Sequence, residues 1–174
     1  MNTADILLLY DYSYWASARI LRATLQVTPE AFAAANTSSY GSLRGTLTHL
    51  LFAEMIWRRR LQGEQMPTGF PQQSDFPTPQ TLYDACLAEE ALMRAYLAGL
   101  NDGSPSASSG QALQAITYYK NTKGLPFQNT TWHILSHLLN HGTQHRAEAA
   151  AMLTDLGHSP GDVDMILYFR EKGI

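Results

Sequence analysis

The sequence predicts an all-α fold, a bundle of four long helices with a small β-hairpin before the last one. Four segments of the 174-residue chain carry apolar residues at helical spacing, and capping residues, prolines or glycines mark their ends. The segments between them are rich in proline, glycine and polar residues. With 45% hydrophobic and 16% charged residues, the composition suits one compact domain over residues 1–174.

The first long helix is expected from Thr3 to about Leu25. This stretch has no glycine or proline, and its apolar residues recur at helical intervals. A short helix or single turn should follow, because Thr28 is a good N-cap and Pro29 suits the first helical position. Residues 36–42, Asn-Thr-Ser-Ser-Tyr-Gly-Ser, should end this part of the chain.

The second long helix is predicted from Ser42, its N-cap, to Leu61, with a broad apolar face. The basic run at residues 58–60 is interpreted as the solvated end of this helix and not as a binding patch. Residues 63–77 contain three prolines and two glycines and should form a loop. The third helix starts at Thr78 with Pro79 and continues to about Leu100.

Residues 101–110 are polar and small, so we expect a surface loop and the best candidate for local mobility. Residues 113–129 are enriched in β-branched and aromatic residues on either side of the polar segment 120–124, which predicts the hairpin. The last long helix should run from Asn129 or Thr130 to Leu156, with Gly157 as its stop and a short helix in the tail. The long connections between helices suggest crossovers or loops that shape a pocket.

The charge and the cysteine content of the chain limit which partners and which cellular location are expected. The formal net charge is -3, so we expect neither nucleic acid nor an anionic membrane as a partner. The apolar run at residues 6–10 is too short to span a membrane and lacks the basic leader of an exported protein. Cys86, the single cysteine, lies on an amphipathic segment and is interpreted as a buried small hydrophobe. A cytoplasmic location is expected.

Four of the six histidines, His133, His137, His141 and His145, recur at intervals of four in the last predicted helix. Residues four apart lie about 6 Å apart along a helix and about 40° around it, so an adjacent pair can bind one metal ion. Over all four the offsets reach about 18 Å and about 120°, so one ion cannot contact the whole set. His133 suits a surface or capping role, while His137 could replace a neighbouring ligand or orient one.

Such a pair needs a third ligand from elsewhere. His49, in the middle of the second predicted helix, is a stronger candidate than His158, which lies beyond a helix stop and is expected to be exposed. Facing helices of a bundle bring ligands together, and three histidines would leave a coordination position for water or substrate. The alternative for His49 alone is a core histidine bonded to a carbonyl or hydroxyl group.

The sequence indicates little about acid and base groups. Glu54 lies five residues after His49, about 140° around the helix, so it should lie off the ligand face. We expect it to be structural or to orient a ligand. Four aromatic residues could line a pocket, although core packing is the commoner role at helical spacing; these are Tyr10, Tyr14, Trp15 and Trp57.

Residues 135–148 resemble the signature of the DinB/YfiT-like metalloenzymes, in which Asn-His is followed four residues later by His-Arg. The first helix, with Trp15 before a small residue, the second helix, with a histidine before Glu and Trp, and residues 156–169 are similar to the same family. The resemblance covers nearly the whole chain. Gln144 and the Ala-Glu after Arg146 depart from the family's commonest wording, His and Gly-Gln.

The resemblance implies a four-helix bundle with up-down-down-up connectivity, frequent homodimers, and a divalent ion, zinc or nickel, held by three histidines. Here His49, His141 and His145 match the ligand positions. The family shares only a name with the translesion polymerase, so no DNA synthesis is implied.

Relatives of this family include S-transferases and isomerases that use low-molecular-weight thiols such as bacillithiol or mycothiol. Our first hypothesis is therefore a metal-dependent transferase or isomerase with a small-molecule substrate and a thiol cosubstrate. The alternatives are a non-catalytic dimer, stapled by metal or binding a small molecule, and a metal-dependent hydrolase, for which the sequence identifies no base. Four protein ligands would indicate a staple, whereas three would leave room for chemistry.

Overall fold

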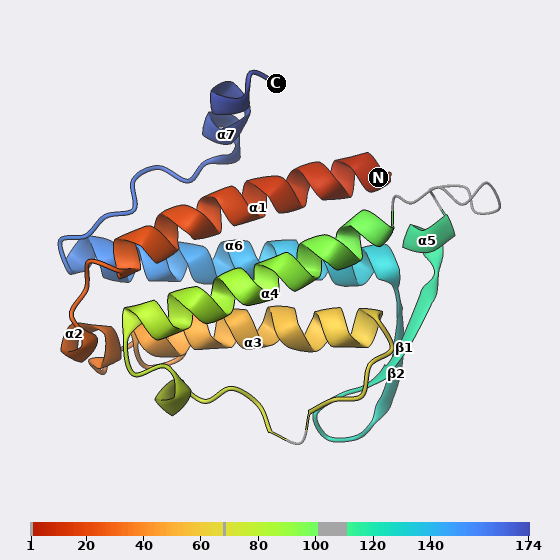
Figure 1. Ribbon diagram of the computed structural model, residues 1–174, viewed down its shortest axis with the longest axis horizontal. Coiled ribbons are helices and arrows are strands. Elements are labelled where there is room, and N and C mark those ends of the chain that lie inside the picture. The colour runs from red at the N-terminus through yellow and green to blue at the C-terminus, as the bar shows by residue number, and fades with distance from the viewer. Residues whose placement is uncertain (1, 68, 101–110) are drawn as a thin grey trace.

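The computed structural model describes residues 2–67, 69–100 and 111–174. Its four long helices are α1 (Thr3–Thr24), α3 (Leu43–Leu61), α4 (Pro79–Gly99) and α6 (Thr131–Asp155). Helices α1 and α6 run in one direction and α3 and α4 in the other (Figure 1). Because α3 and α4 are parallel, the segment between them must return along the length of the bundle, which explains why it is long. The predicted all-α bundle with up-down-down-up connectivity is confirmed.

Local capping sets the helix boundaries. The side chains of Thr28, Ser42 and Thr78 each accept a hydrogen bond from the backbone N–H three residues later, as their positions in the sequence predict. Asn2 caps α1 in the same way, which the sequence analysis did not anticipate. After α6, Gly157 has a φ of 81°, a left-handed conformation that favours glycine.

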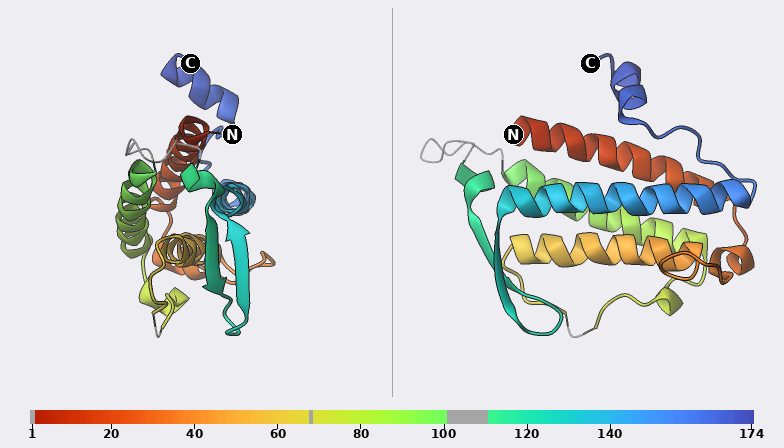
Figure 2. Two further views of the ribbon diagram at one scale, coloured as in Figure 1. Left: turned by 90° about the vertical axis from the view of Figure 1, so that its right-hand side faces the viewer. Right: turned by 180° about the vertical axis from the view of Figure 1, so that it is seen from behind.

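The shorter elements lie around the four long helices. They are α2 (Pro29–Ala33), the 3-10 turn η1 (Gln73–Asp75), α5 (Gln111–Gln114), β1 (Ile116–Lys120), β2 (Pro126–Thr130) and α7 (Met165–Lys172). The two strands pair antiparallel, with Ile116 opposite Thr130, and lie across one end of the bundle (Figure 2). The predicted hairpin is confirmed, whereas η1 and α5 are too short for periodicity to reveal. The loop expected at residues 101–110 lies outside the described residues.

Two hydrophobic clusters form the core, and α1, α4 and α6 contribute to both. The first comprises Ile20, Val27, Phe32, Leu43, Leu47, Leu51, Phe76, Leu82, Ala149 and Leu153. The second comprises Ile6, Tyr10, Tyr14, Met93, Leu97, Leu113, Leu135 and Leu138. Tyr10 and Tyr14 are therefore core residues, as their spacing suggested. Cys86 is partly buried and packs against the first cluster, and burial raises the pKa of its thiol to about 12, in accord with a hydrophobic role.

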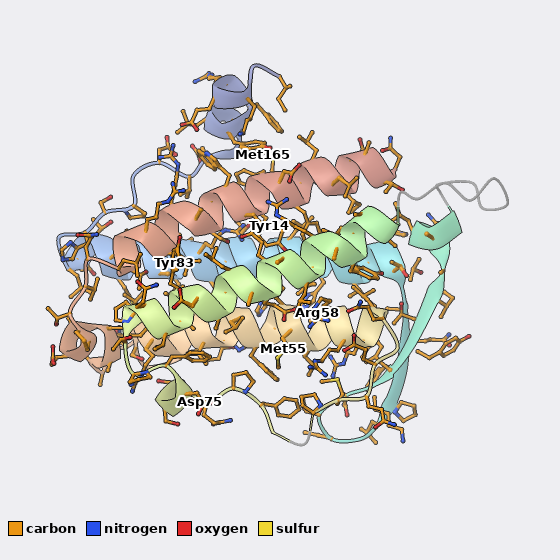
Figure 3. All side chains as sticks on the ribbon, in the orientation of Figure 1. Tyr14, Met55, Arg58, Asp75, Tyr83 and Met165 are labelled. Carbon is orange, nitrogen blue, oxygen red and sulfur yellow. The ribbon has the colours of Figure 1, made fainter. Side chains whose placement is uncertain are left out.

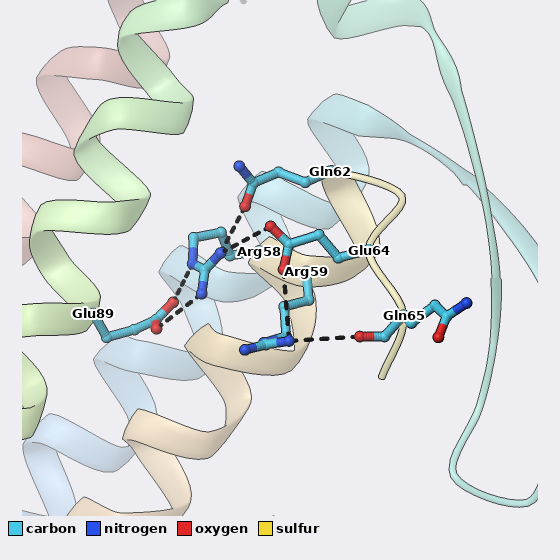
Figure 4. Close-up of polar contacts among 6 residues, drawn as sticks. All are labelled: Arg58, Arg59, Gln62, Glu64, Gln65 and Glu89. Atoms are coloured by element: carbon cyan, nitrogen blue, oxygen red, sulfur yellow. Dashed lines mark hydrogen bonds and ion pairs between the residues drawn. The ribbon is translucent and has the colours of Figure 1, made fainter. Parts of the chain in front are cut away.

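Two of the three arginines at the end of α3, Arg58 and Arg60, are buried, contrary to the interpretation of this run as a solvated helix end. The Arg58 guanidinium donates two hydrogen bonds to Glu89 of α4, with Nε 2.5 Å from Oε1, and the two side chains are only 5% and 7% exposed (Figure 4). Arg60 is also buried and donates to the carbonyl oxygen of Lys120 in β1 at 3.0 Å. Both partners come from distant segments, so no local pattern could identify them.

Helix α7 packs on the outer side of α1 (Figure 2). Trp15 donates its indole N–H to Glu171 at 2.9 Å, and Arg19 forms an ion pair with the same carboxylate at 2.6 Å. A groove of about 1090 Å³ lies among α1, α4 and α7, and Trp15 and Tyr14 help to line it. In the part of the chain that the structure describes, no helix is long and apolar enough to cross a membrane.

Candidate metal centre

Three imidazole rings meet where α3 packs against α6. His49 comes from α3, and His141 and His145 come from successive turns of α6. One potential ligand atom from each residue lies within 4.8 Å of the others, and the Nε2 atoms of His49 and His141 are 3.0 Å apart. His145 is buried, whereas His49 and His141 are half-buried, so the cluster is reachable from solvent. The structure therefore brings together the three residues that the family signature indicates.

The other histidines lie outside this cluster. His133 is exposed, as predicted. His137 is also exposed, with its ring 5.6 Å from that of His141 and edge-on to Trp57 at 5.5 Å between centroids. His158 is half-buried and not exposed as expected. Of the four histidines spaced along α6, only the last two belong to the cluster, in accord with the angular offset of the helix.

Tyr40 covers His49 and was not anticipated from the sequence. Its hydroxyl lies 2.8 Å from His49 Nε2, and the two rings stack at 3.8 Å between centroids with an interplanar angle of 15°. The residue belongs to the loop before α3, which lies directly on the first turn of that helix. A Cβ atom at Gly45 would lie 2.1 Å from the Tyr40 carbonyl oxygen, so only glycine permits this approach.

Glu148 orients the buried ring of His145. Its Oε2 lies 3.1 Å from His145 Nδ1, and its Oε1 accepts the backbone N–H of Ser39 at 2.8 Å. A carboxylate at Nδ1 favours the tautomer with its hydrogen on that atom, which leaves Nε2 with a free lone pair. The i,i+3 spacing of the two residues on one helix could have revealed this contact.

The cluster favours the neutral forms of His49 and His141. Burial lowers the pKa of His49 to about 4, with a smaller contribution from His145. Burial also lowers the pKa of His141 to about 4, followed by the neighbouring His145 and His49. Burial alone would raise the pKa of Glu148, but hydrogen bonds from Ser39 and His145 outweigh it and lower the pKa. Metal ions bind neutral imidazole, so two rings are ready to act as ligands at neutral pH.

The DinB family model matches residues 1–173. The chain belongs to the DinB family. It is also similar to Protein DinB of Bacillus subtilis (strain 168), with 22% identity over 166 residues that cover 92% of this chain and 91% of that protein. The match to the family model over almost the entire chain confirms the resemblance seen in the residues of the first, second and last long helices.

In this DinB-family chain the donor set fits a divalent transition metal. Nitrogen ligands at about 2.0 to 2.1 Å from a tetrahedral ion lie roughly 3.3 Å from one another. The 3.0 Å between His49 Nε2 and His141 Nε2 is close to that value, and a ligand atom of His145 lies within 4.8 Å of both residues' ligand atoms. Three neutral imidazoles suit zinc, nickel, copper or iron. Their role as ligands remains a prediction from the family signature, which this geometry supports.

The remaining candidate, Glu54, is not a member of the histidine cluster, in accord with its position on α3, but it shares the wall of a cavity of about 30 Å³ with His141. Its Oε1 accepts a short hydrogen bond from the Tyr14 hydroxyl of α1. Trp57, three residues later, helps to line a surface pocket of about 300 Å³ with His133 and His137. Tyr10 and Tyr14 thus lie in the core and Trp15 lines the groove beside α7. Trp57 packs edge-on against His137, which lies outside the cluster.

Proposed function

We propose that the protein is a divalent-metal-dependent enzyme that uses a low-molecular-weight thiol, as an S-transferase or an isomerase. The observation that carries the proposal is the convergence of His49, His141 and His145 within 4.8 Å. Zinc or nickel is the proposed ion, and a small molecule is the proposed substrate. The thiol chemistry rests on the family resemblance. Homodimer formation and a cytoplasmic location also stay predictions.

The residues around the cluster have separable roles in this proposal. A divalent ion held by three neutral imidazoles keeps its full positive charge and would favour the thiolate over the thiol form of a bound cosubstrate. His49, His141 and His145 would hold the ion, and Glu148 would fix the ring of His145. Tyr40 covers one side of His49 and so narrows the approach to the site.

The number of protein donors favours an enzyme over a metal staple. Within residues 2–67, 69–100 and 111–174, the cluster contains three metal-binding side chains of the histidine, cysteine or carboxylate type. A structural zinc site usually has four, whereas three leave a position for substrate or water. The half-buried rings of His49 and His141 support the same choice, since a small molecule can reach them.

The experiment combines metal analysis with a substrate screen. Protein purified without an affinity tag is expected to bind about one equivalent of zinc or nickel, and the His141→Ala variant should lose it while the His133→Ala variant keeps it. The metal-loaded protein is then assayed with small thiols and electrophiles for conjugation or isomerisation. Full metal stoichiometry in His141→Ala would refute the site, and binding without turnover of any thiol would favour the non-catalytic alternative.

A further inference from the structure

A second polar cluster lies inside the bundle, apart from the three histidines. Figure 3 labels Tyr14 between α1 and α4. Its hydroxyl donates to Glu54 Oε1 of α3, and its ring lies under the Arg94 guanidinium of α4 at 4.5 Å. From α6, the buried Arg146 donates to the Ser13 hydroxyl of α1 at 2.8 Å. Residues of all four long helices therefore surround Glu54.

Glu54 and Arg146 line two small cavities. One has a volume of about 40 Å³ and mostly hydrocarbon walls. The other has a volume of about 30 Å³, and His141 forms part of its wall together with Glu54 and Arg146. A cavity of about 10–15 Å³ already admits a water molecule if polar partners are present. The hydroxyl groups of Ser13 and Ser17 on the wall of the second cavity provide such partners.

The surroundings of Glu54 bring the pKa of its carboxyl group close to neutral pH. Burial raises the pKa of Glu54 to about 7; the Tyr14 hydrogen bond lowers it, Glu89 and Glu90 raise it, and Arg146 lowers it. The titratable and charged groups that face it are Tyr10 and Tyr14 of α1, Arg58 of α3, Cys86, Glu89 and Glu90 of α4, and Arg146 of α6. A group that titrates near the working pH exchanges protons efficiently in either direction.

Two neighbours of Glu54, Tyr14 and Arg146, keep the same protonation state near neutral pH. Burial, followed by the charge of Glu54, raises the pKa of Tyr14, so its hydroxyl remains a donor. Burial lowers the pKa of Arg146, but a guanidinium group stays cationic at neutral pH, and its charge lowers the pKa of Glu54. A Cβ atom at Gly142 would lie 2.7 Å from Arg146 Nη1, so this glycine makes room for the guanidinium against α6. Glu54 is thus the member of the cluster that can gain or lose a proton.

We propose that Glu54 accepts the proton released at the His49–His141–His145 site, through water in the cavity that Glu54 and His141 share. This inference rests on the proposed function, because it needs a thiol that loses its proton at that site. The cavity between Glu54 and His141, both on its wall, is the observation that carries it. Tyr14 is a positioning residue that holds one carboxylate oxygen.

The proton transfer balances without any further reagent. The S–H bond of the thiol breaks, the electron pair stays on sulfur, and the proton passes through water to the Glu54 carboxylate, which becomes neutral. When the product leaves, the same group returns the proton to product or solvent. No electron is gained or lost by the protein in this step.

Infrared spectroscopy of the metal-free protein tests Glu54 directly, because a protonated carboxyl group and a carboxylate absorb at different frequencies. We expect a carboxyl band that disappears with a midpoint near pH 7 and is absent in Glu54→Gln. Tyr14→Phe should raise the midpoint, since it removes the hydrogen bond that lowers the pKa. Glu90→Gln should lower it, since it removes a nearby negative charge. A midpoint near 4.5, or one that neither variant moves, would overturn the proposal.

Zinc addition tests whether Glu54 and the histidine site are coupled. A cation across the shared cavity favours the carboxylate, so one equivalent of Zn²⁺ should lower the midpoint by about one pH unit. His137→Ala is the matched control and should show the same shift. If Zn²⁺ binds with full stoichiometry and the midpoint stays unchanged, the two sites are independent and the proposal fails.

Calorimetry with 2-mercaptoethanol as the thiol probe separates this inference from the proposed function. Titrations in two buffers of different ionisation enthalpy count the protons released when the thiol binds to the zinc-loaded protein. At pH 7 the wild type should release fewer protons than Glu54→Gln, because Glu54 retains part of them. Equal release contradicts the inference. If neither protein binds the thiol, the thiol-dependent function fails, and with it the role of Glu54 as acceptor of a thiol proton, even where the zinc titration shows coupling.

Discussion

Glu148 Oε2 lies 3.1 Å from Nδ1 of His145, the most deeply buried ring of the histidine cluster. The same carboxylate accepts the backbone N–H of Ser39, so it connects α6 to the loop that carries Tyr40. One side chain thereby fixes both the orientation of a predicted ligand and the position of the loop beside it.

Replacing Glu148 by alanine should weaken metal binding by about 10–100-fold, since the ring of His145 loses the partner that sets its tautomer and angle. Glu148→Gln keeps an acceptor oxygen and should lose less. Isothermal titration with Zn²⁺ measures the affinity, and Asp155→Ala, an exposed acid near the end of the same helix, is the control. An unchanged affinity in Glu148→Ala would show that the contact does not orient a ligand.

Metal binding should stabilise the fold through the three clustered histidines alone. At a free Zn²⁺ concentration 100 times the dissociation constant, the free energy of unfolding should rise by about 2.7 kcal/mol. Urea denaturation with and without Zn²⁺ measures the change. We expect His145→Ala to abolish it and His133→Ala to preserve it, because His133 is exposed outside the cluster. If His133→Ala abolished the increase and His145→Ala preserved it, the ion would bind near His133 and not at the histidine cluster.

Glu54 should make the wild type less stable as the pH rises. Its pKa is about 7 in the folded chain, against an ordinary value of 4.5, so between these values the folded state retains a proton that the unfolded state has lost. Stability from this group is full below about pH 4.5 and lost by about pH 7. Glu54→Gln should therefore gain stability over the wild type from pH 5 to pH 8, by about 1–3 kcal/mol.

Chemical denaturation of both proteins at several pH values checks this difference. The neutral histidines have the opposite trend, since their lowered pKa values cost stability as the pH falls from 6.5 towards 4. That contribution is common to both proteins and cancels in the comparison. A difference between the variants that does not change with pH would contradict the proton uptake assigned to Glu54.

The buried Arg58–Glu89 ion pair should contribute far more to the free energy of unfolding than the exposed pair of Arg94 and Asp11. Glu89→Ala removes the buried carboxylate that Arg58 contacts most closely and leaves Gln62 and the more distant, exposed Glu64 beside the guanidinium. It should cost about 3–5 kcal/mol of unfolding free energy. Asp11→Ala breaks a pair whose side chains are 44% and 50% exposed and should cost about 1 kcal/mol or less. Urea denaturation measures both, and equal losses would mean that Arg58 finds another partner or water.

Much of the fold follows from local signals. Thr28, Ser42 and Thr78 mark helix starts, and the apolar spacing between such marks gives the four long helices. The ion pair of Arg58 could not be predicted from local sequence, because its partner, Glu89, lies on another helix. A basic run therefore looked solvated although its first member is buried.

The histidine site was only partly predictable. Helical geometry limits one ion to an adjacent pair along α6, but it does not say which pair, and the choice of His141 and His145 came from the family signature. Tyr40 could not be found, since its place over His49 depends on how the preceding loop packs onto Gly45. Helical geometry predicts that Glu54 lies off the ligand face. Its hydrogen bond with Tyr14 could not be predicted, because Tyr14 lies on a different helix.

Helix α6 contributes to both hydrophobic clusters and carries two of the three clustered histidines. During synthesis on the ribosome, the earlier helices emerge before the segment that covers them, and neither half of the interior can close until α6 has left the exit tunnel. The nascent chain must therefore keep the apolar surfaces of α1, α3 and α4 exposed until α6 has been made. Assembly of the interior and formation of the histidine cluster then become a single late event.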